Sequence, residues 1–131
     1  MTSGALRPAE VHAYVRDRAQ DGLRGVAVYE GADLDVRYAR TDLEAAVEAR
    51  FEAIHESILA TAGAPDGEHW GTLGAERASI QIRDEAAVMH LRPTEGDDPT
   101  RRGMLVELDT RVAQSLAEFV ASVREVAFDE A

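Results

Sequence analysis

Two pairs of short alternating segments, separated by one long amphipathic segment, constrain the fold of this chain more than any other feature. Residues 25–30 and 34–38 place apolar side chains at every second position on either side of a glycine-containing turn, and residues 78–83 and 86–92 repeat the pattern. Two runs of this period joined by a short turn predict a β-hairpin. Two hairpins separated by a helix predict an antiparallel or mixed sheet with helices packed on it, and argue against a doubly wound parallel sheet.

The segment between the hairpins, residues 41–61, is the clearest helix in the sequence. Thr41 and Glu44 have the spacing of a capping box, in which each side chain binds a free backbone N–H of the first turn. The apolar residues that follow recur at spacings of three and four, which places them on one helical face. They are Leu43, Val47, Phe51, Ile54 and Ile58. The solvent-exposed face of the helix is predicted to carry Glu44, Glu48, Glu52, His55 and Glu56.

Two further helices are predicted, one before the first hairpin and one near the end of the sequence. Pro8 suits a first helical turn, because its missing N–H is not needed there, and Gly22 is predicted to end this helix in a left-handed cap. Residues 104–108 form a last strand, and Asp109 or Thr110 begins the final helix. The predicted fold is an α+β, sandwich-like domain with a sheet of about five strands covered by three helices, in the order α-β-β-α-β-β-β-α.

The length of 131 residues predicts a single domain over residues 1–131, with residues 1–6 flexible. A domain of this size buries enough surface to form one core without disulfides. Val, Leu and Ile supply most of the predicted core. Its larger side chains are predicted to be Tyr14, Tyr29, Phe51, Trp70 and Phe119. The sequence leaves open whether residues 68–76 form an additional strand.

The charge composition predicts a protein adapted to high salt. All 14 basic residues are arginine, against 25 Asp and Glu, and the formal net charge is −11. Such a net charge destabilises the compact state through self-repulsion, which molar salt largely removes by shortening the screening length to about 3 Å. Together with abundant Ala and the absence of Asn, this pattern predicts a cytoplasmic protein of a salt-accumulating archaeon.

The same composition argues against several classes of function. With no cysteine, the chain has no disulfide framework, thiolate metal site or thiol nucleophile. No stretch approaches the ~20 apolar residues of a membrane span, and residues 1–7 lack the basic start and apolar core of a signal peptide. The excess of carboxylates argues against a nucleic-acid partner, because phosphate contacts need cationic patches.

Two resemblances to known families arise from these segments. The element order resembles that of roadblock/dynein-light-chain and profilin-like domains. In addition, LRGVAVYE at 23–30, DEAAVMHLRP at 84–93 and RGMLVELDTRVAQSLAEFV at 102–120 resemble segments of small uncharacterised haloarchaeal proteins of about this length. This second resemblance implies a haloarchaeal source and the same order of elements, and it implies no catalytic residue.

The histidines and serines do not form a catalytic or metal-binding pattern. The four histidines lack the spacing that places two imidazoles on one helical face, so a metal site would have to combine His55 and Glu56 with the distant His69. His90 lies within a predicted strand, where we expect a half-exposed side chain that is hydrogen-bonded to a neighbour. No G-x-S-x-G elbow is present. We therefore predict no catalytic residue, no metal and no cofactor.

Two groups of residues stay as candidates for binding. The first would line a small-molecule pocket if the fold brought its members together, and consists of Tyr38, His69, Trp70 and His90. The second is the adjacent basic pair Arg101 and Arg102. These two arginines either contact an anionic partner or pair with Asp97 and Asp98, and the sequence favours the pairing.

A non-enzymatic domain that acts as a homodimer, for assembly or regulation of a protein partner, is the leading hypothesis for function. A sheet with an unpaired edge, or the helix at 41–61, supplies a surface for self-association. One alternative is a small-molecule or metal-dependent sensor or enzyme that uses the pocket just described. Another is a DNA-associated regulator that uses Arg77, Arg101 and Arg102.

Overall fold

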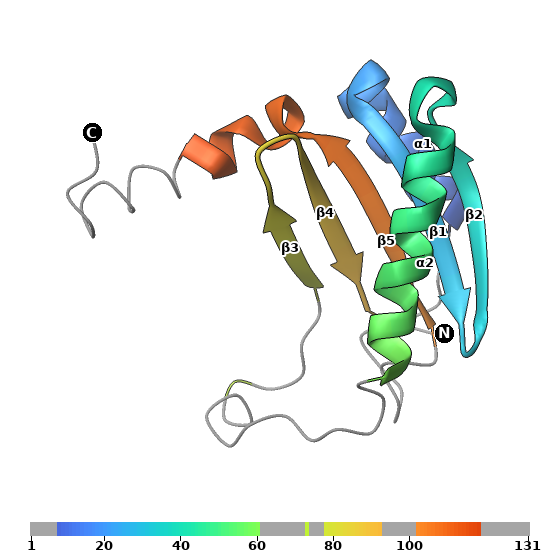
Figure 1. Cartoon of the computed structure of the whole chain (residues 1–131). Coiled ribbons are helices and arrows are strands. Elements are labelled where there is room, and N and C mark those ends of the chain that lie inside the picture. The colour runs from blue at the N-terminus through green and yellow to red at the C-terminus, as the bar shows by residue number, and fades with distance from the viewer. Residues whose placement is uncertain (1–7, 61–72, 74–77, 93–101, 119–131) are drawn as a thin grey trace.

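The computed structural model of the chain describes residues 8–60, 73, 78–92 and 102–118. Within these residues the chain forms one five-stranded sheet with helices on both faces (Figure 1). Some of the predictions concern residues outside the described ones. They are the flexible segment 1–6, most of the possible strand at 68–76, and the roles of His69, Trp70, Arg77, Asp97, Asp98, Arg101 and Phe119.

The sheet confirms the predicted α+β class, with antiparallel pairing throughout. The strands are β1 (Leu23–Glu30), β2 (Asp33–Ala39), β3 (Ala78–Ile82), β4 (Ala86–Leu91) and β5 (Arg102–Asp109). They lie in the order β2-β1-β5-β4-β3, and every neighbouring pair is antiparallel. The two predicted hairpins are β1–β2 and β3–β4. The last strand, β5, lies between them and joins them into one sheet.

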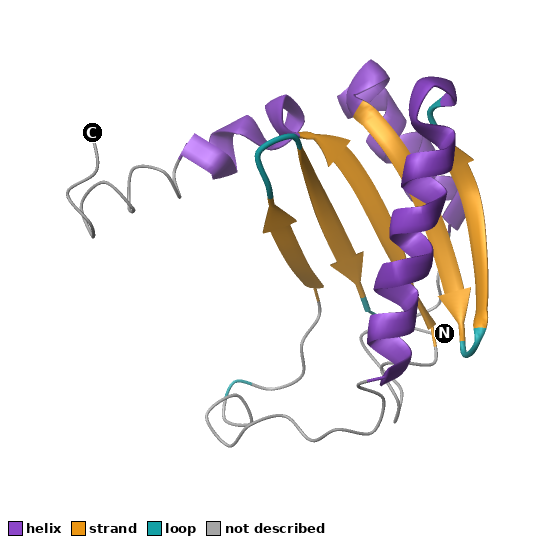
Figure 2. Cartoon of the chain, viewed as in Figure 1, coloured by secondary structure: helices purple, strands orange, loops and turns teal. Residues whose placement is uncertain are grey.

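Two α-helices, α1 (Pro8–Ala19) and α2 (Glu44–Ala60), pack on opposite faces of this sheet (Figure 2). Short 3-10 turns adjoin them, at Gln20–Gly22 after α1 and at Thr41–Leu43 before α2. A third helical segment begins with the 3-10 turn Thr110–Ala113 and continues as an α-helix. The order of elements is therefore the predicted one. Among the described helices, none combines the length and the apolar character needed to cross a membrane.

One half of the core lies between the sheet and α2. Tyr29 and Phe51 are its largest side chains, and both are buried, as the sequence predicts. Gly25 lets α2 approach β1 closely, because a Cβ at this position would lie 2.5 Å from Val47 Cγ1 and 3.0 Å from the Phe51 ring. The other buried members of this layer are Ala27, Val47, Ile58 and Leu105.

The other half of the core lies between the sheet and α1, where Val11 and Val15 pack on the strands. The buried strand residues of this layer are Leu23, Val26, Met104, Val106 and Leu108. The prediction for Tyr14 is wrong, because its side chain is 58% exposed and packs against the Arg18 guanidinium, 3.7 Å from the ring centre. The narrow stripe of α1 that meets the sheet is occupied by the two valines instead.

The ends of the helices differ from the predicted caps. The left-handed residue after α1 is Gln20, with φ of 49°, rather than Gly22. Gly22 lies against the Val112 side chain, so a Cβ at this position would force that side chain to shift. Before α2, the turn Thr41–Leu43 is a 3-10 helix that follows Arg40 and lacks a side-chain cap hydrogen bond, so the predicted capping box does not form.

Candidate functional site

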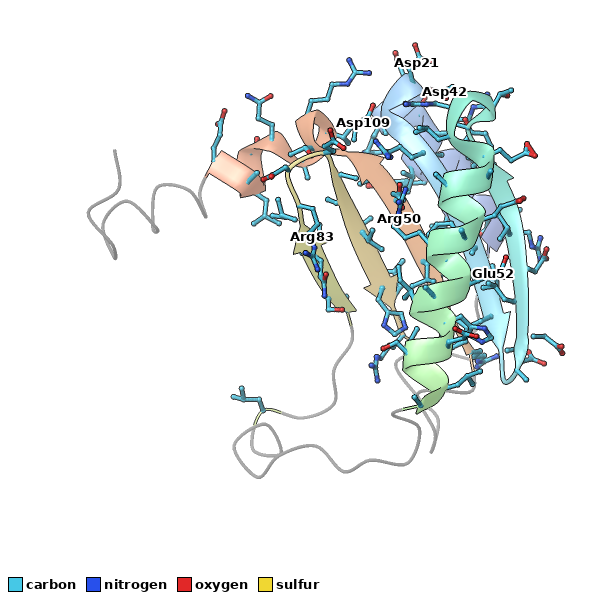
Figure 3. All side chains as sticks on the ribbon, in the orientation of Figure 1. Asp21, Asp42, Arg50, Glu52, Arg83 and Asp109 are labelled. Atoms are coloured by element: carbon cyan, nitrogen blue, oxygen red, sulfur yellow. The ribbon has the colours of Figure 1, made fainter. Side chains whose placement is uncertain are left out.

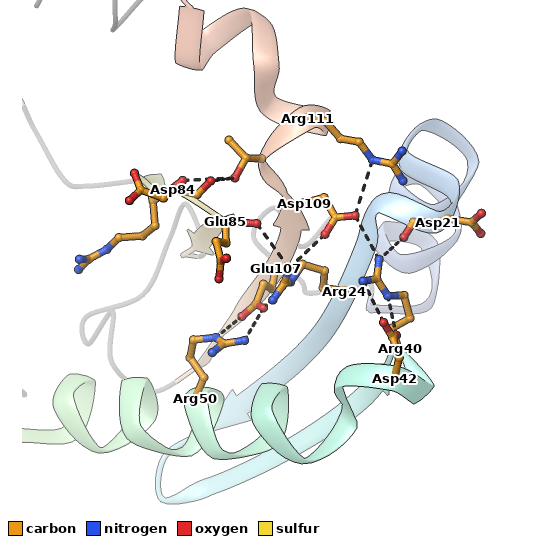
Figure 4. A network of polar contacts seen from close by, with 12 residues as sticks. Asp21, Arg24, Arg40, Asp42, Arg50, Asp84, Glu85, Glu107, Asp109 and Arg111 are labelled. Carbon is orange, nitrogen blue, oxygen red and sulfur yellow. Dashed lines mark hydrogen bonds and ion pairs between the residues drawn. The ribbon is translucent and has the colours of Figure 1, made fainter.

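An arginine–carboxylate cluster joins β1, β5 and α2 on the face of the sheet that α2 covers (Figure 4). Its members are Arg24, Arg40, Arg50, Glu107 and Asp109. Because side chains alternate along a strand, β5 points both carboxylates to this face while Val106 and Leu108 enter the core beneath α1. A bulge between Leu23 and Gly25 brings Arg24 to the same face as the carboxylates.

Glu107 is the centre of the cluster, and its side chain is 0% exposed. Its Oε1 accepts a hydrogen bond from Arg50 Nε at 2.6 Å. Its Oε2 accepts hydrogen bonds from Arg24 Nε at 2.8 Å and from Arg50 Nη2 at 2.7 Å. A buried carboxylate is tolerated only when it is paired and hydrogen-bonded. These contacts meet that requirement, and through them Arg50 ties α2 to the middle of the sheet.

Asp109 is the second carboxylate of the cluster. Its Oδ1 accepts a hydrogen bond from Arg24 Nη1 and its Oδ2 accepts one from Arg40 Nη1, both at 3.1 Å. Burial by itself would raise the pKa of Asp109, but the hydrogen bonds and charges of Arg24 and Arg40 outweigh burial and lower this pKa below its ordinary value. Asp109 therefore stays ionised at neutral pH and, through Arg40, holds the connection between β2 and α2 against the end of β5.

The cluster works as a clamp between elements. Each carboxylate oxygen of Glu107 and Asp109 accepts a hydrogen bond from an arginine, and these arginines come from β1, from α2 and from the connection between β2 and α2. Sequence reasoning missed this cluster, although a signal was present. Glu107 is the single charge in the run GMLVEL, residues 103–108, and a charge inside a buried strand is rarely found without a partner.

A pocket of about 610 Å³ opens beside the cluster. On this face of the sheet, α2 leaves β3 and β4 uncovered (Figure 3), and residues of both strands line the pocket. Its lining consists of Arg24, Arg50, Ile82, Arg83, Asp84, Glu85, Ala86 and Val88. The floor is therefore apolar, and the charged side chains come from α2, β1 and the β3–β4 turn.

A second polar group lies on the same face of the sheet, where two histidines flank Tyr29. Tyr29 Oη is 2.7 Å from His90 Nε2, and the His55 ring centre is 5.4 Å from that of Tyr29. Gly103 leaves room for the hydroxyl, because a Cβ there would lie 2.5 Å from Tyr29 Oη. The prediction that His55 lies on the solvent-exposed face of α2 is wrong. Its side chain is buried, and its Nε2 donates a hydrogen bond to the Gly31 carbonyl at 2.9 Å.

The environment of His90 predicts a loss of stability in mild acid. Burial of the ring, and secondarily the charge of Arg92, lowers its pKa from 6.5 to about 4. Between these pH values the unfolded chain binds a proton that the folded chain does not bind. The contribution of His90 to the free energy of unfolding is therefore complete above pH 6.5, and it is lost as the pH falls toward 4. Because part of the ring faces solvent, we expect a loss of about 2 kcal/mol.

Urea unfolding at a series of pH values checks this prediction. In the His90→Gln variant the side chain no longer titrates, so the variant should lose less stability than the unsubstituted chain between pH 6.5 and 4. The carboxylates titrate in both proteins, so their effect on the free energy of unfolding cancels when the two proteins are compared. Parallel curves for the two proteins would contradict the assigned role of His90.

The described residues of the proposed small-molecule pocket lie on opposite faces of the sheet. Tyr38 faces α1, where its ring centre is 5.1 Å from that of His12 and 5.5 Å from Arg16 Cζ. His90 faces the α2 side and contacts Tyr29. The structure therefore does not bring Tyr38 and His90 together.

The remaining candidates are only partly described. His69, Trp70 and Arg101 lie outside the described residues. Arg102 is the first residue of β5, and its Cα is in register with that of Glu30 on β1. Arg102 therefore lies at the end of β5 that is opposite to Glu107 and Asp109.

No curated protein matches this chain. A family model described as "Domain of unknown function (DUF7522)" matches residues 9–128, a range that includes every strand of the sheet. The chain therefore belongs to the DUF7522 family of domains of unknown function.

Proposed function

We propose that this domain is a non-enzymatic homodimerisation module, for assembly or regulation of a protein partner, in which two copies pair along β3. The observation that carries the proposal is that β3 is an edge strand of the sheet formed by the described residues and has no charged side chain, in a chain whose residues are 30% charged. An edge strand presents unpaired N–H and C=O groups, and proteins commonly protect such edges with charges or proline. β3 carries neither.

The backbone of β3 has one side that faces away from β4. Arg83 N donates a hydrogen bond to Ala86 O at 2.8 Å, and hydrogen-bonded pairs alternate with non-hydrogen-bonded pairs along an antiparallel ladder. Gln81 therefore directs its backbone groups toward β4, whereas Ile80 and Ile82 direct theirs outward. Within the described part of the chain, these outward groups pair with no other strand.

The opposite edge of the sheet is protected. β2 begins at Asp33 and carries Asp35 and Arg37, whose side chains form an ion pair at 2.6 Å. Charged side chains along an edge disfavour its pairing with a second copy. The contrast between the two edges favours β3 as the surface for self-association.

A two-fold axis at Ile80 would make the pairing isologous, with the same surface on both copies. Ile80 would face the partner's Ile80, and Ser79 would lie opposite the partner's Gln81. Within the bounds of β3, Ala78–Ile82, no charged residues would then lie opposite each other across the axis. This matters for a chain with a net charge of −11, because two such chains repel each other at any charged surface.

We further propose that this module works in the cytoplasm of a salt-accumulating archaeon and that its fold is roadblock-like. The element order supports the resemblance, and exposed carboxylates on α2, including Glu44, Glu52 and Glu56, support the adaptation to salt. Salt screens repulsion between exposed charges. Molar KCl should therefore strengthen the dimer.

Replacing Ile80 by proline is expected to convert the dimer to a monomer in molar KCl while the fold stays intact. Proline removes one outward N–H at the centre of the pairing and leaves the ladder with β4 complete. Size-exclusion chromatography with light scattering measures the mass, and circular dichroism checks the fold. Ile80→Val, which keeps the N–H and the strand preference, is the matched control and should remain dimeric.

Two results would contradict the proposal. One is a strict monomer of the unsubstituted chain at every concentration in molar KCl. The other is an Ile80→Pro variant that remains dimeric with unchanged circular dichroism, because pairing would then use a surface other than β3.

A further inference from the structure

The pocket beside the arginine–carboxylate cluster has charged groups of opposite sign on facing sides (Figure 4). Arg50 of α2 lies on one side, and Asp84 and Glu85 of the β3–β4 turn lie on the other. Ala86 and Val88 of β4 provide apolar surface between them. The volume of about 610 Å³ is in the usual range of sites for small molecules.

Arg50 presents a guanidinium group that is held in position by the protein. Its Nε and Nη2 bind Glu107, which orients the plane of the group. Its Nη1 has no hydrogen-bond partner among the described residues, and the side chain is 39% exposed. A guanidinium that is already ordered loses less entropy when it binds a ligand, and its donors suit a carboxylate.

The carboxylates of Asp84 and Glu85 form no ion pair with any described residue. Figure 4 shows the Glu85 side chain directed toward Arg50, with no bond drawn between them. The neighbouring Arg83 uses its Nη2 to donate a hydrogen bond to Gln81 Oε1 on its own strand at 3.1 Å. The pocket therefore keeps a cationic donor, Arg50, and the carboxylate of Glu85, which are not bound to one another.

We infer that this pocket binds a small zwitterion with an apolar body, of which an aliphatic α-amino acid is the simplest example. The ligand carboxylate binds Arg50, its ammonium group binds Glu85, and its apolar side chain covers Val88. A simple anion would meet the carboxylates of the turn, and a simple cation would meet the arginines, so each is disfavoured by one side of the pocket. This inference does not depend on the pairing of β3.

Calorimetric titration of the full chain in molar KCl tests the inference with three probes of similar size. They are L-leucine, isocaproate, which lacks the ammonium group, and isoamylamine, which lacks the carboxylate. Leucine should bind at least about tenfold more tightly than either analogue. Glu85→Gln should weaken leucine binding by about tenfold. Glu52→Gln removes the same charge from the exposed side of α2 and should leave leucine binding unchanged.

Several outcomes would overturn the inference. If isocaproate binds as tightly as leucine, the pocket is an anion site, and if isoamylamine does so, it is a cation site. Leucine binding that is unaffected by Glu85→Gln would place the ligand elsewhere. Absence of binding by leucine would also overturn the inference. The Ile80→Pro variant should bind leucine as the unsubstituted chain does, which separates this test from that of the dimer.

Discussion

The Glu107→Gln variant is expected to unfold with a free energy about 3 kcal/mol lower than that of the unsubstituted chain. The amide keeps the size of the side chain but removes the negative charge that Arg24 and Arg50 share. It also turns an NH2 group toward guanidinium donors, because an amide has only one acceptor oxygen. Arg24, whose side chain is 14% exposed, cannot regain full hydration while β1 stays paired with β5.

Urea unfolding at neutral pH in molar KCl measures this effect. The control is again Glu52→Gln, which should change the free energy of unfolding by no more than about 0.5 kcal/mol, because its carboxylate is exposed. A loss below about 1 kcal/mol for Glu107→Gln would mean that both arginines turn toward water at little cost. The cluster would then not act as a clamp between α2 and the sheet.

The Phe51→Ala variant is expected to lose about 4 kcal/mol of stability, which is typical of a buried phenylalanine. Phe51 is fully buried between α2 and β1, and its ring fills the space that Gly25 leaves open. Removing the ring loses its transfer free energy and leaves a cavity that the neighbouring strands cannot close, because they are paired on both sides.

The same urea experiment measures the loss for Phe51→Ala, with Leu59→Ala as its control on the same helix. Leu59 is partly exposed, so its truncation should cost about 1 kcal/mol. Equal losses for the two variants would contradict the packing described for α2. They would indicate that the side chains between α2 and the sheet repack and fill the cavity that the missing ring leaves.

The type and the order of the elements could be predicted because periodicity is a property of neighbouring residues. Alternation at 25–30 and 34–38 indicates a hairpin whatever the rest of the chain does. Spacings of three and four likewise identify the helix that contains Phe51, and the structure confirms both. The burial of Phe51 and Tyr29 follows from the size of their apolar surface.

Besides the two helix caps, the predictions that failed are those that depend on what lies beside an element. Tyr14 is as apolar as a core residue, yet Val11 and Val15 occupy the side of α1 that meets the sheet. His55 is polar, yet it is buried because the carbonyl of Gly31 at the β1–β2 turn supplies a partner for its N–H. A partner of this kind cannot be identified from the local pattern.

The sequence by itself determined that this chain forms two hairpins and three helical segments. Only the tertiary structure decided which partners meet. Arg24 and Glu107 are 83 residues apart and bind each other because β5 enters the sheet beside β1. Such contacts follow from strand order and register, and these depend on the packing of the whole chain rather than on the residues next to each charge.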